Sequence, residues 1–118
     1  MKYTILGKIP SKSNCYKVIT LGGHGSLAKT KALKEYERKF FLQCTERERN
    51  IQGFFKLRID VYLESQRQDL DNPLKTFLDC LQQCHVIKND NTCIEIIARK
   101  FIDKVNPRVE YELEEVEL

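Results

Sequence analysis

The sequence predicts a single α+β domain in which a mixed β-sheet carries two amphipathic helices, with the elements in the order β-α-β-α-β-β. The length of 118 residues is that of one ordinary domain. Segments with an apolar residue at every second position alternate with segments of helical spacing. No repeat, low-complexity run or linker divides residues 1–118. The content of 42% hydrophobic and 31% charged residues excludes the disordered and collagen-like classes.

The first half of the chain predicts one strand and one helix. A short strand is expected over residues 3–9, and it ends at Pro10. Residues 10–27 are expected to form a loop, because their glycine-rich stretch disfavours regular structure. An amphipathic helix is predicted over residues 28–48, where apolar residues recur at spacings of three and four. These residues are Leu33, Tyr36, Phe40 and Cys44.

The second half predicts two strands around a helix and a final strand. Residues 54–64 alternate strictly between apolar and polar side chains, as in a strand with one buried face. A second helix over 73–84 begins at Pro73, which suits a first helical turn. Strands are expected over 93–101 and 108–113, with a turn between them. This order is typical of a sheet with its helices on one face.

Several classes of protein are excluded by composition. No apolar run approaches the ~18–20 residues that cross a bilayer, and the first ten residues are too polar for a secretory signal. We therefore expect a cytoplasmic chain without a membrane partner. The odd number of five cysteines argues against a disulfide framework. Reduced thiols in or near the core are expected, with a structural zinc site at Cys80 and Cys84 as the alternative.

Charge is distributed unevenly along the chain. Residues 1–60 carry 13 Lys/Arg and 5 Asp/Glu, a net of +8, whereas residues 61–118 carry 7 and 12, a net of −5. A basic half suggests a polyanionic partner. The alternative is that these cations only solvate helix surfaces, and charge alone favours neither interpretation. The glutamates within residues 112–117 are expected to form an exposed acidic tail.

The pattern that bears on chemistry lies between residues 69 and 90. Asp69 and Asp71 are two positions apart, so an extended segment places them on the same side. Asp71, Lys75 and Asp79 follow at helical spacing and share one helix face. Asp90 precedes the third strand of the predicted sheet. If that strand lies beside the 54–64 strand, Asp90 can reach the first two aspartates.

Three carboxylates at one place repel each other unless a cation lies between them. Mg²⁺ prefers such oxygen ligands, and it can activate a water molecule and polarise a phosphodiester. Lys75 would then stabilise negative charge in the transition state. The alternative is structural: Asp71 or Asn72 caps the second helix, and Lys75 with Asp79 forms a surface ion pair of little energetic weight.

These residues carry a resemblance to a known family. The run from Gln68 to Asn72, followed by Lys75, Asp79 and Leu81 and then by Asn89-Asp90, resembles the D-L-D-N-x-x-K-x-x-x-D-x-L pattern of the RusA family of Holliday-junction resolvases. Residues 10–14 are similar to the Pro-Ser-Lys-Asn segment near the start of that family. The order of the predicted elements agrees over nearly the whole chain.

The resemblance implies a function and a set of roles. It implies a homodimeric, Mg²⁺-dependent endonuclease, with Mn²⁺ as an alternative ion, that makes paired symmetric nicks in four-way DNA junctions. It assigns metal binding to Asp69, Asp71 and Asp90, catalysis to these three and Lys75, and no small-molecule cofactor. It also implies a phage or prophage gene. The basic half then supplies phosphate contacts, for which the candidates are Lys12, Lys17, Lys29, Lys31 and Lys34.

The sequence departs from the family pattern at two positions beside the site. Asn89 stands where the family often has an acid, and Gln68 replaces a frequent arginine. A non-catalytic DNA-junction-binding protein with the same fold is therefore an alternative. A protein-interaction domain whose acids only cap a helix is another.

Overall fold

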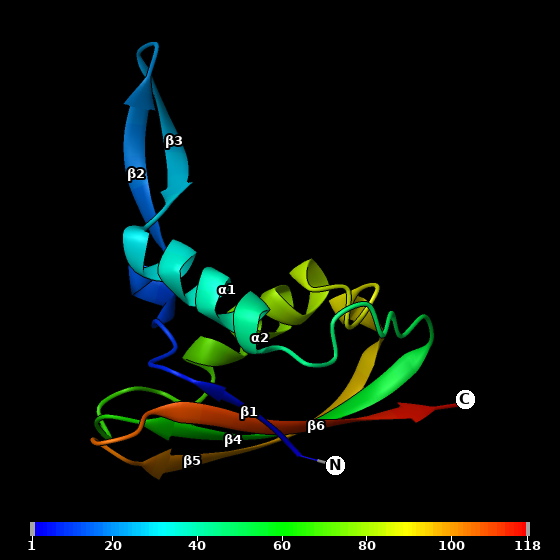
Figure 1. Ribbon diagram of the computed structural model, residues 1–118. Coiled ribbons are helices and arrows are strands. Elements are labelled where there is room, and N and C mark those ends of the chain that lie inside the picture. The colour runs from blue at the N-terminus through cyan, green and yellow to red at the C-terminus, as the bar shows by residue number, and fades with distance from the viewer. Residues whose placement is uncertain (1, 118) are drawn as a thin grey trace.

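The computed structural model describes residues 2–117, and it places both α-helices on one face of a four-stranded sheet (Figure 1). The strands of this sheet, in spatial order, are β1 (Tyr3–Leu6), β6 (Arg108–Val116), β4 (Phe54–Leu63) and β5 (Cys93–Ile102). The helices are α1 (Lys31–Gln43) and α2 (Asn72–Gln83). The predicted α+β class and the order of its six main elements are confirmed.

Strand pairing makes the sheet mixed. β6 runs antiparallel to both β1 and β4. β4 and β5 are parallel neighbours, in register from Phe55 opposite Cys93 to Leu63 opposite Ile102. Parallel neighbours need a crossover connection, and α2 provides it. The adjacency on which the position of Asp90 depends is therefore present.

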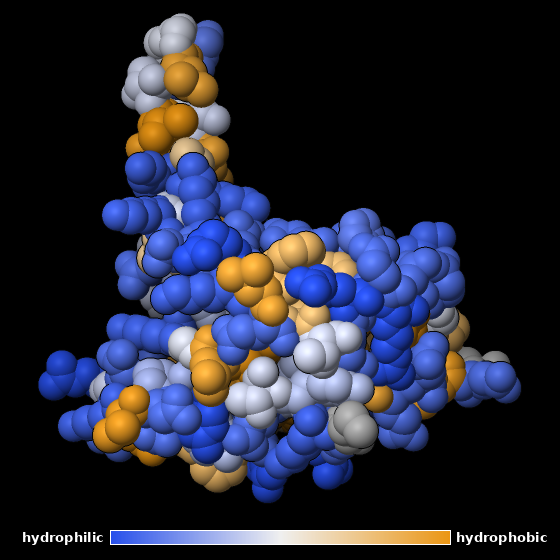
Figure 2. Space-filling view, viewed as in Figure 1, coloured by the Kyte–Doolittle hydropathy of each residue, from blue (hydrophilic) through white to orange (hydrophobic). Residues whose placement is uncertain are grey.

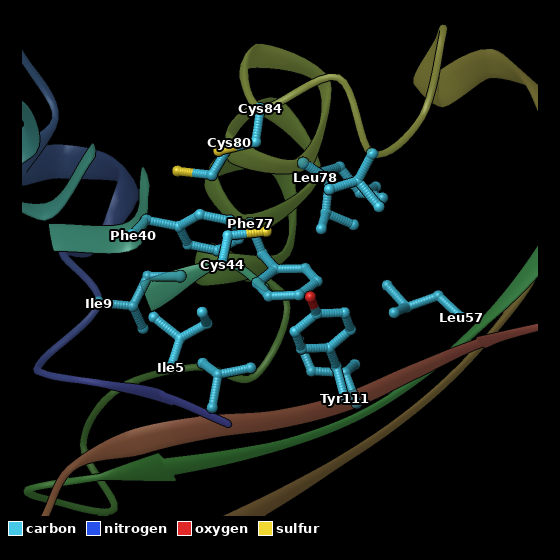
Figure 3. Packing of buried hydrophobic residues seen from close by; sticks show 14 of the residues in the cluster. Ile5, Ile9, Phe40, Cys44, Leu57, Phe77, Leu78, Cys80, Cys84 and Tyr111 are labelled. Atoms are coloured by element: carbon cyan, nitrogen blue, oxygen red, sulfur yellow. The ribbon is translucent and has the colours of Figure 1, made fainter. Parts of the chain in front are cut away.

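The core lies between the sheet and the two helices (Figure 3). The alternating apolar residues of β4 are each at most 2% exposed. Phe77 of α2 connects the layers, because its ring packs edge-on at 5.6 Å from Phe40 of α1 and 5.0 Å from Tyr111 of β6. Removing a buried ring of this kind costs about 3–5 kcal/mol of stability. The helix face that carries Phe77 is thus fixed against the sheet, and the opposite face of α2 remains open to solvent.

The first helix is shorter than the predicted 28–48 range. Thr30 is its N-cap, and the Thr30 side chain accepts a hydrogen bond from the Leu33 amide at 3.3 Å. Residues before Thr30 belong to a strand. The helix ends at Gln43, and the following turns contain Glu48 and Asn50 with φ of +67° and +53°, which no α-helix accommodates. The helical pattern beyond Gln43 was therefore misleading.

The prediction of a loop over residues 10–27 was wrong for most of its length. A short 3₁₀ turn η1 (Lys12–Asn14) is followed by a hairpin of β2 (Tyr16–Leu21) and β3 (His24–Lys29). Gly22 and Gly23 join the strands with φ of +56° and +84°. Two-residue hairpin turns favour such left-handed residues. The glycines therefore form the turn of a hairpin and do not prevent strand formation.

The acidic residues predicted to form an exposed C-terminal tail are mostly exposed, but all except Glu117 lie in the sheet. β6 extends to Val116, and Glu115 lies 3.4 Å from the Arg49 guanidinium. Glu112 lies 3.8 Å from Arg58 of the neighbouring β4. Cross-strand cations therefore offset much of this acidic run.

All five cysteines are free, and four of them are buried. Burial raises the pKa of the Cys80 thiol to about 12, so this thiol stays protonated at neutral pH. The expectation of reduced thiols in or near the core is confirmed. Over residues 2–117, no helix has the length and apolarity that a membrane crossing requires.

Candidate active site

The start of α2 presents Asp71 to solvent. Pro73 occupies the first turn, where its missing N–H costs nothing. Asp71 holds the N-cap position, but its side chain makes no capping hydrogen bond. The structural interpretation of this aspartate as a side-chain cap is therefore not supported, and its carboxylate is available to a ligand.

Asp69 lies two residues before Asp71 on the loop after β4. Both aspartates are exposed. Within residues 2–117, neither carboxylate has a hydrogen-bond or ion-pair partner. The positive end of the α2 dipole lies beside them, at the N-terminus of the helix. Two exposed carboxylates without partners, two positions apart, are suited to holding a cation.

Lys75, on the solvent face of α2, contacts two aspartates. Its ammonium nitrogen donates a hydrogen bond to Asp90, and it lies 3.1 Å from Asp79 one turn along the helix. The hydrogen bond to Asp90, with a smaller contribution from Asp79, raises the pKa of Lys75. The group is therefore charged at every pH at which a DNA-processing enzyme operates.

Asp90 is positioned from two sides. It begins the 3₁₀ turn η2 (Asp90–Thr92), which leads directly into β5. Its amide donates to the Gln82 side-chain oxygen of α2 at 3.3 Å. Asn89 is the N-cap of η2, and its side chain accepts from the Asn91 amide at 3.0 Å. Asn89, one of the two departures from the family pattern, therefore supports the turn that presents Asp90.

The structure brings together only part of the predicted set. Asp90, Lys75 and Asp79 are in contact. Among residues 2–117, no three His, Cys, Asp or Glu side chains are grouped closely enough to hold a metal ion. The convergence of Asp69, Asp71 and Asp90 on one ion stays a prediction.

The donor chemistry of this region nevertheless fits a hard divalent cation. All three aspartates offer oxygen atoms, which Mg²⁺ prefers. Next to Asp69, the side-chain oxygen of Gln68 is buried and accepts no hydrogen bond from the described residues. Buried oxygen atoms are normally satisfied, so this oxygen is a further candidate ligand atom in the same loop. We conclude that the residues fit such an ion chemically.

Lys100 is a residue of this region that sequence reasoning missed. Its ammonium group donates to the carbonyl oxygens of Gln66 at 3.2 Å and Gln68 at 3.1 Å. The loop before Asp69 is thereby tied to β5. No sequence motif marked this contact, because the partners of Lys100 are backbone carbonyl oxygens; in the structure it lies at the same strand parity as Ala98 and Ile102, the parity that pairs with the buried residues of β4. A lysine on that side of a strand needs a local partner for its charge.

The predicted phosphate-binding lysines all lie on the N-terminal part of the chain. They are Lys12 in η1, Lys17 in β2, Lys29 in β3, and Lys31 and Lys34 in α1. Lys29 pairs with Glu37 at 2.9 Å, and this hydrogen bond raises the pKa of Lys29. The other four have no ion pair with any residue from 2 to 117. Four of the five lysines therefore have no internal acidic partner.

Comparison with known proteins identifies relatives of this chain. The family described as "Endodeoxyribonuclease RusA" matches residues 10–114. A "Crossover junction endodeoxyribonuclease RusA" from Aquifex aeolicus (strain VF5) is 30% identical over 103 residues, which cover 84% of this chain and 79% of the relative. The family match includes the whole region from the β2–β3 hairpin to β5.

Proposed function

The chain belongs to the RusA family of endodeoxyribonucleases, and from that premise we propose that it makes paired symmetric nicks in four-way DNA junctions in a reaction that requires Mg²⁺. The observation that carries the proposal is the position of Lys75. Its charged ammonium group lies against Asp90, on the helix that follows two aspartates without protein partners. Asp60 of β4, by contrast, is neutralised by Arg99 and Lys2.

In the proposal, Asp69, Asp71 and Asp90 hold the ion. Bound there, Mg²⁺, or Mn²⁺ in its place, would supply an activated water and polarise a phosphodiester oxygen. The protein's part is to hold the three carboxylates on one side of the β4-α2-β5 unit. Lys100 fixes the loop of the first two aspartates, and Asn89 fixes the turn of the third.

Lys75 is proposed as the catalytic lysine. The negative charge that develops on the phosphate during cleavage needs a preorganised cation nearby. Asp90 and Asp79 hold the ammonium group at the surface of α2, where substrate can reach it. When DNA is bound, the phosphate competes with these carboxylates for the same N–H donors.

We further propose a homodimer that acts on DNA in the cytoplasm. Two active sites related by a two-fold axis suit a junction of near two-fold symmetry. Lys12, Lys17, Lys31 and Lys34, together with Lys29, supply phosphate contacts. Binding should then weaken steeply as salt rises. The phage or prophage origin that the resemblance implies stays a prediction.

The test is cleavage of a synthetic four-way junction by the purified protein. With Mg²⁺ we expect paired nicks at symmetric positions, and with EDTA or on a linear duplex of the same sequence we expect none. Denaturing gels of each labelled strand distinguish paired from single nicks. Junction binding without cleavage in either Mg²⁺ or Mn²⁺ would instead identify a non-catalytic junction-binding protein. Failure to bind DNA at all would contradict both.

A further inference from the structure

The β2–β3 hairpin stands away from the rest of the molecule as an arm, defined here as residues 16–29 (Figure 1). Val18 and Leu27 lie directly opposite each other in its register. Their exposed fractions are 75% and 70%, and apolar side chains gather on the arm in Figure 2. A two-stranded hairpin is marginally stable by itself in water. Such an apolar pair at the surface gains stability only when it contacts a partner.

The base of the arm is fixed to the helix that carries the candidate active site. The Thr30 amide donates to the Cys15 carbonyl oxygen at 2.9 Å, which closes the arm at its root. The buried Cys15 thiol lies 3.4 Å from the Thr76 hydroxyl of α2. Thr76 follows Lys75 in the chain. The arm and the candidate catalytic lysine therefore keep a fixed relation to each other.

The charge of this segment favours a polyanion as the partner. Residues 1–34 contain seven lysines and no aspartate or glutamate. A groove of ≈ 510 Å³ at the root of the arm is lined by polar and apolar residues together, among them Lys8, Lys17 and Tyr16, and none of its lining residues is acidic. A second copy of the arm offers no acidic residue to meet Lys17, whereas DNA carries one negative charge per phosphate.

We propose that the arm inserts Val18 and Leu27 between bases at the branch point of a DNA junction. Apolar side chains are known to enter base steps that are unstacked or easily unstacked, and the base pairs flanking a branch point have lost one stacking neighbour. Lys17 lies on the opposite face of the arm from Val18, where it can meet a phosphate. The inference rests on the proposed function and adds that the arm recognises the branch point of the substrate.

The experiment compares the wild-type protein with the double variant V18T/L27T. Threonine keeps the strand preference of these positions while making them polar. Each protein is titrated, in EDTA, onto a four-way junction with 2-aminopurine beside the branch point and onto a linear duplex of the same sequence. For the wild type we expect fluorescence to rise on junction binding as bases unstack. For the variant we expect no rise, about tenfold weaker junction binding and unchanged duplex binding.

Val105→Thr is the matched control. It removes an apolar side chain that is 94% exposed, at a turn between β5 and β6. We expect it to behave as the wild type.

Three outcomes would overturn the inference. A double variant that keeps both the fluorescence rise and the preference for junctions shows that the arm does not enter the branch point. If the wild type sediments as a dimer and the double variant sediments as a monomer, the arm joins two copies of the chain. Both leave the proposed function intact if the wild type still nicks junctions. If the wild type binds neither the junction nor the duplex, both the proposed function and the proposed role of the arm are overturned.

Discussion

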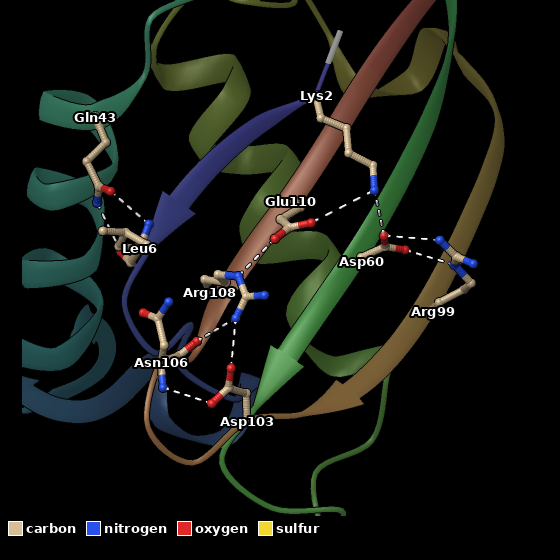
Figure 4. A network of polar contacts seen from close by, with 9 residues as sticks. All are labelled: Lys2, Leu6, Gln43, Asp60, Arg99, Asp103, Asn106, Arg108 and Glu110. Atoms are coloured by element: carbon tan, nitrogen blue, oxygen red, sulfur yellow. Dashed lines mark hydrogen bonds and ion pairs between the residues drawn. The ribbon is translucent and has the colours of Figure 1, made fainter.

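Two groups of aspartates in this molecule lie in opposite environments, one buried and paired and the other exposed. Asp60 of β4 points to the sheet face that lacks helices, and its side chain is only 3% exposed because Arg99 and Lys2 cover it (Figure 4). Arg99 donates to both of its carboxylate oxygens, at 2.9 and 3.1 Å. Asp69 and Asp71, fewer than a dozen residues later, have no such partner among residues 2–117.

The difference separates a structural from a functional use of the same side chain. Burying a carboxylate is costly unless cations and hydrogen bonds compensate it, and the network around Asp60 provides both. A carboxylate that must bind a ligand has to remain accessible and unsatisfied within the protein. Replacing each kind of aspartate with asparagine, which changes the charge but hardly the shape, should therefore affect different properties.

Asp71→Asn is expected to give the largest effect. Loss of one ligand charge should reduce junction cleavage by at least about a hundredfold, since a catalytic ion contributes several kcal/mol to stabilising the transition state. The unfolding free energy should change by less than about 0.5 kcal/mol, as is usual for an exposed position. Strand-specific gels and urea unfolding measure the two properties. Cleavage at the wild-type rate would show that Asp71 is not part of the site.

Lys100→Met is expected to lower cleavage about tenfold, which is typical for a residue that orients the groups around a metal site. The variant keeps the length of the side chain but releases the carbonyl oxygens of Gln66 and Gln68. The loss should be partly restored by raising the Mg²⁺ concentration, which a purely structural role would not predict. Lys56→Met, which removes a cation paired with Glu95 elsewhere on the sheet, is the control and should cleave normally.

Asp60→Asn should destabilise the fold and leave the chemistry unchanged. We expect a loss of about 1 kcal/mol, because three charge-assisted hydrogen bonds weaken while the exposed side chains of Arg99 and Lys2 are free to hydrate. The midpoint of urea unfolding gives this value. The cleavage rate per folded molecule should equal that of the wild type. A marked loss of cleavage would show that this face of the sheet also contributes to function.

The smallest expected effect is the change with pH in the stability difference between the wild type and Asp60→Asn. Burial opposes the ionisation of Asp60, but hydrogen bonds from Arg99 and Lys2 outweigh it and lower its pKa. A lowered pKa in the folded state stabilises the protein above the unfolded pKa of about 4. The stabilisation is lost as pH falls through the folded pKa. The advantage of the wild type over Asp60→Asn should be constant between pH 7 and 5 and should shrink at pH 3.

Periodicity predicted those parts of the fold whose stability comes from one buried face. The alternation in β4 and the helical spacing in α2 each describe a surface packed against the core, and both elements appear close to the predicted ranges. The arm has no buried face, so it leaves no such pattern. Its signal was the run Val18-Ile19-Thr20-Leu21 before Gly22, which is typical of a strand entering a tight turn.

The sequence predicted those contacts of the candidate site that a motif records, and it did not predict the contact of Lys100 with the backbone. The spacing of Lys75 and Asp79 predicted their contact on α2, and the position of Asp90 beside this helix followed once β4 and β5 were neighbours. Lys100 could not be found from a linear motif, because its partners are backbone carbonyl oxygens more than thirty residues away. Backbone acceptors carry no sequence signature. Contacts of this kind become visible only in three dimensions.

The place of β6 has a consequence for the synthesis of the protein. This strand is made last among those described, yet it lies inside the sheet between β1 and β4. While the chain emerges from the ribosome, β1 therefore waits for a partner about a hundred residues downstream, and such distant pairing slows folding. Until β6 is made, Asp69, Asp71 and Lys75 have no completed sheet beneath them. A chain interrupted before residue 108 should therefore be unable to damage DNA.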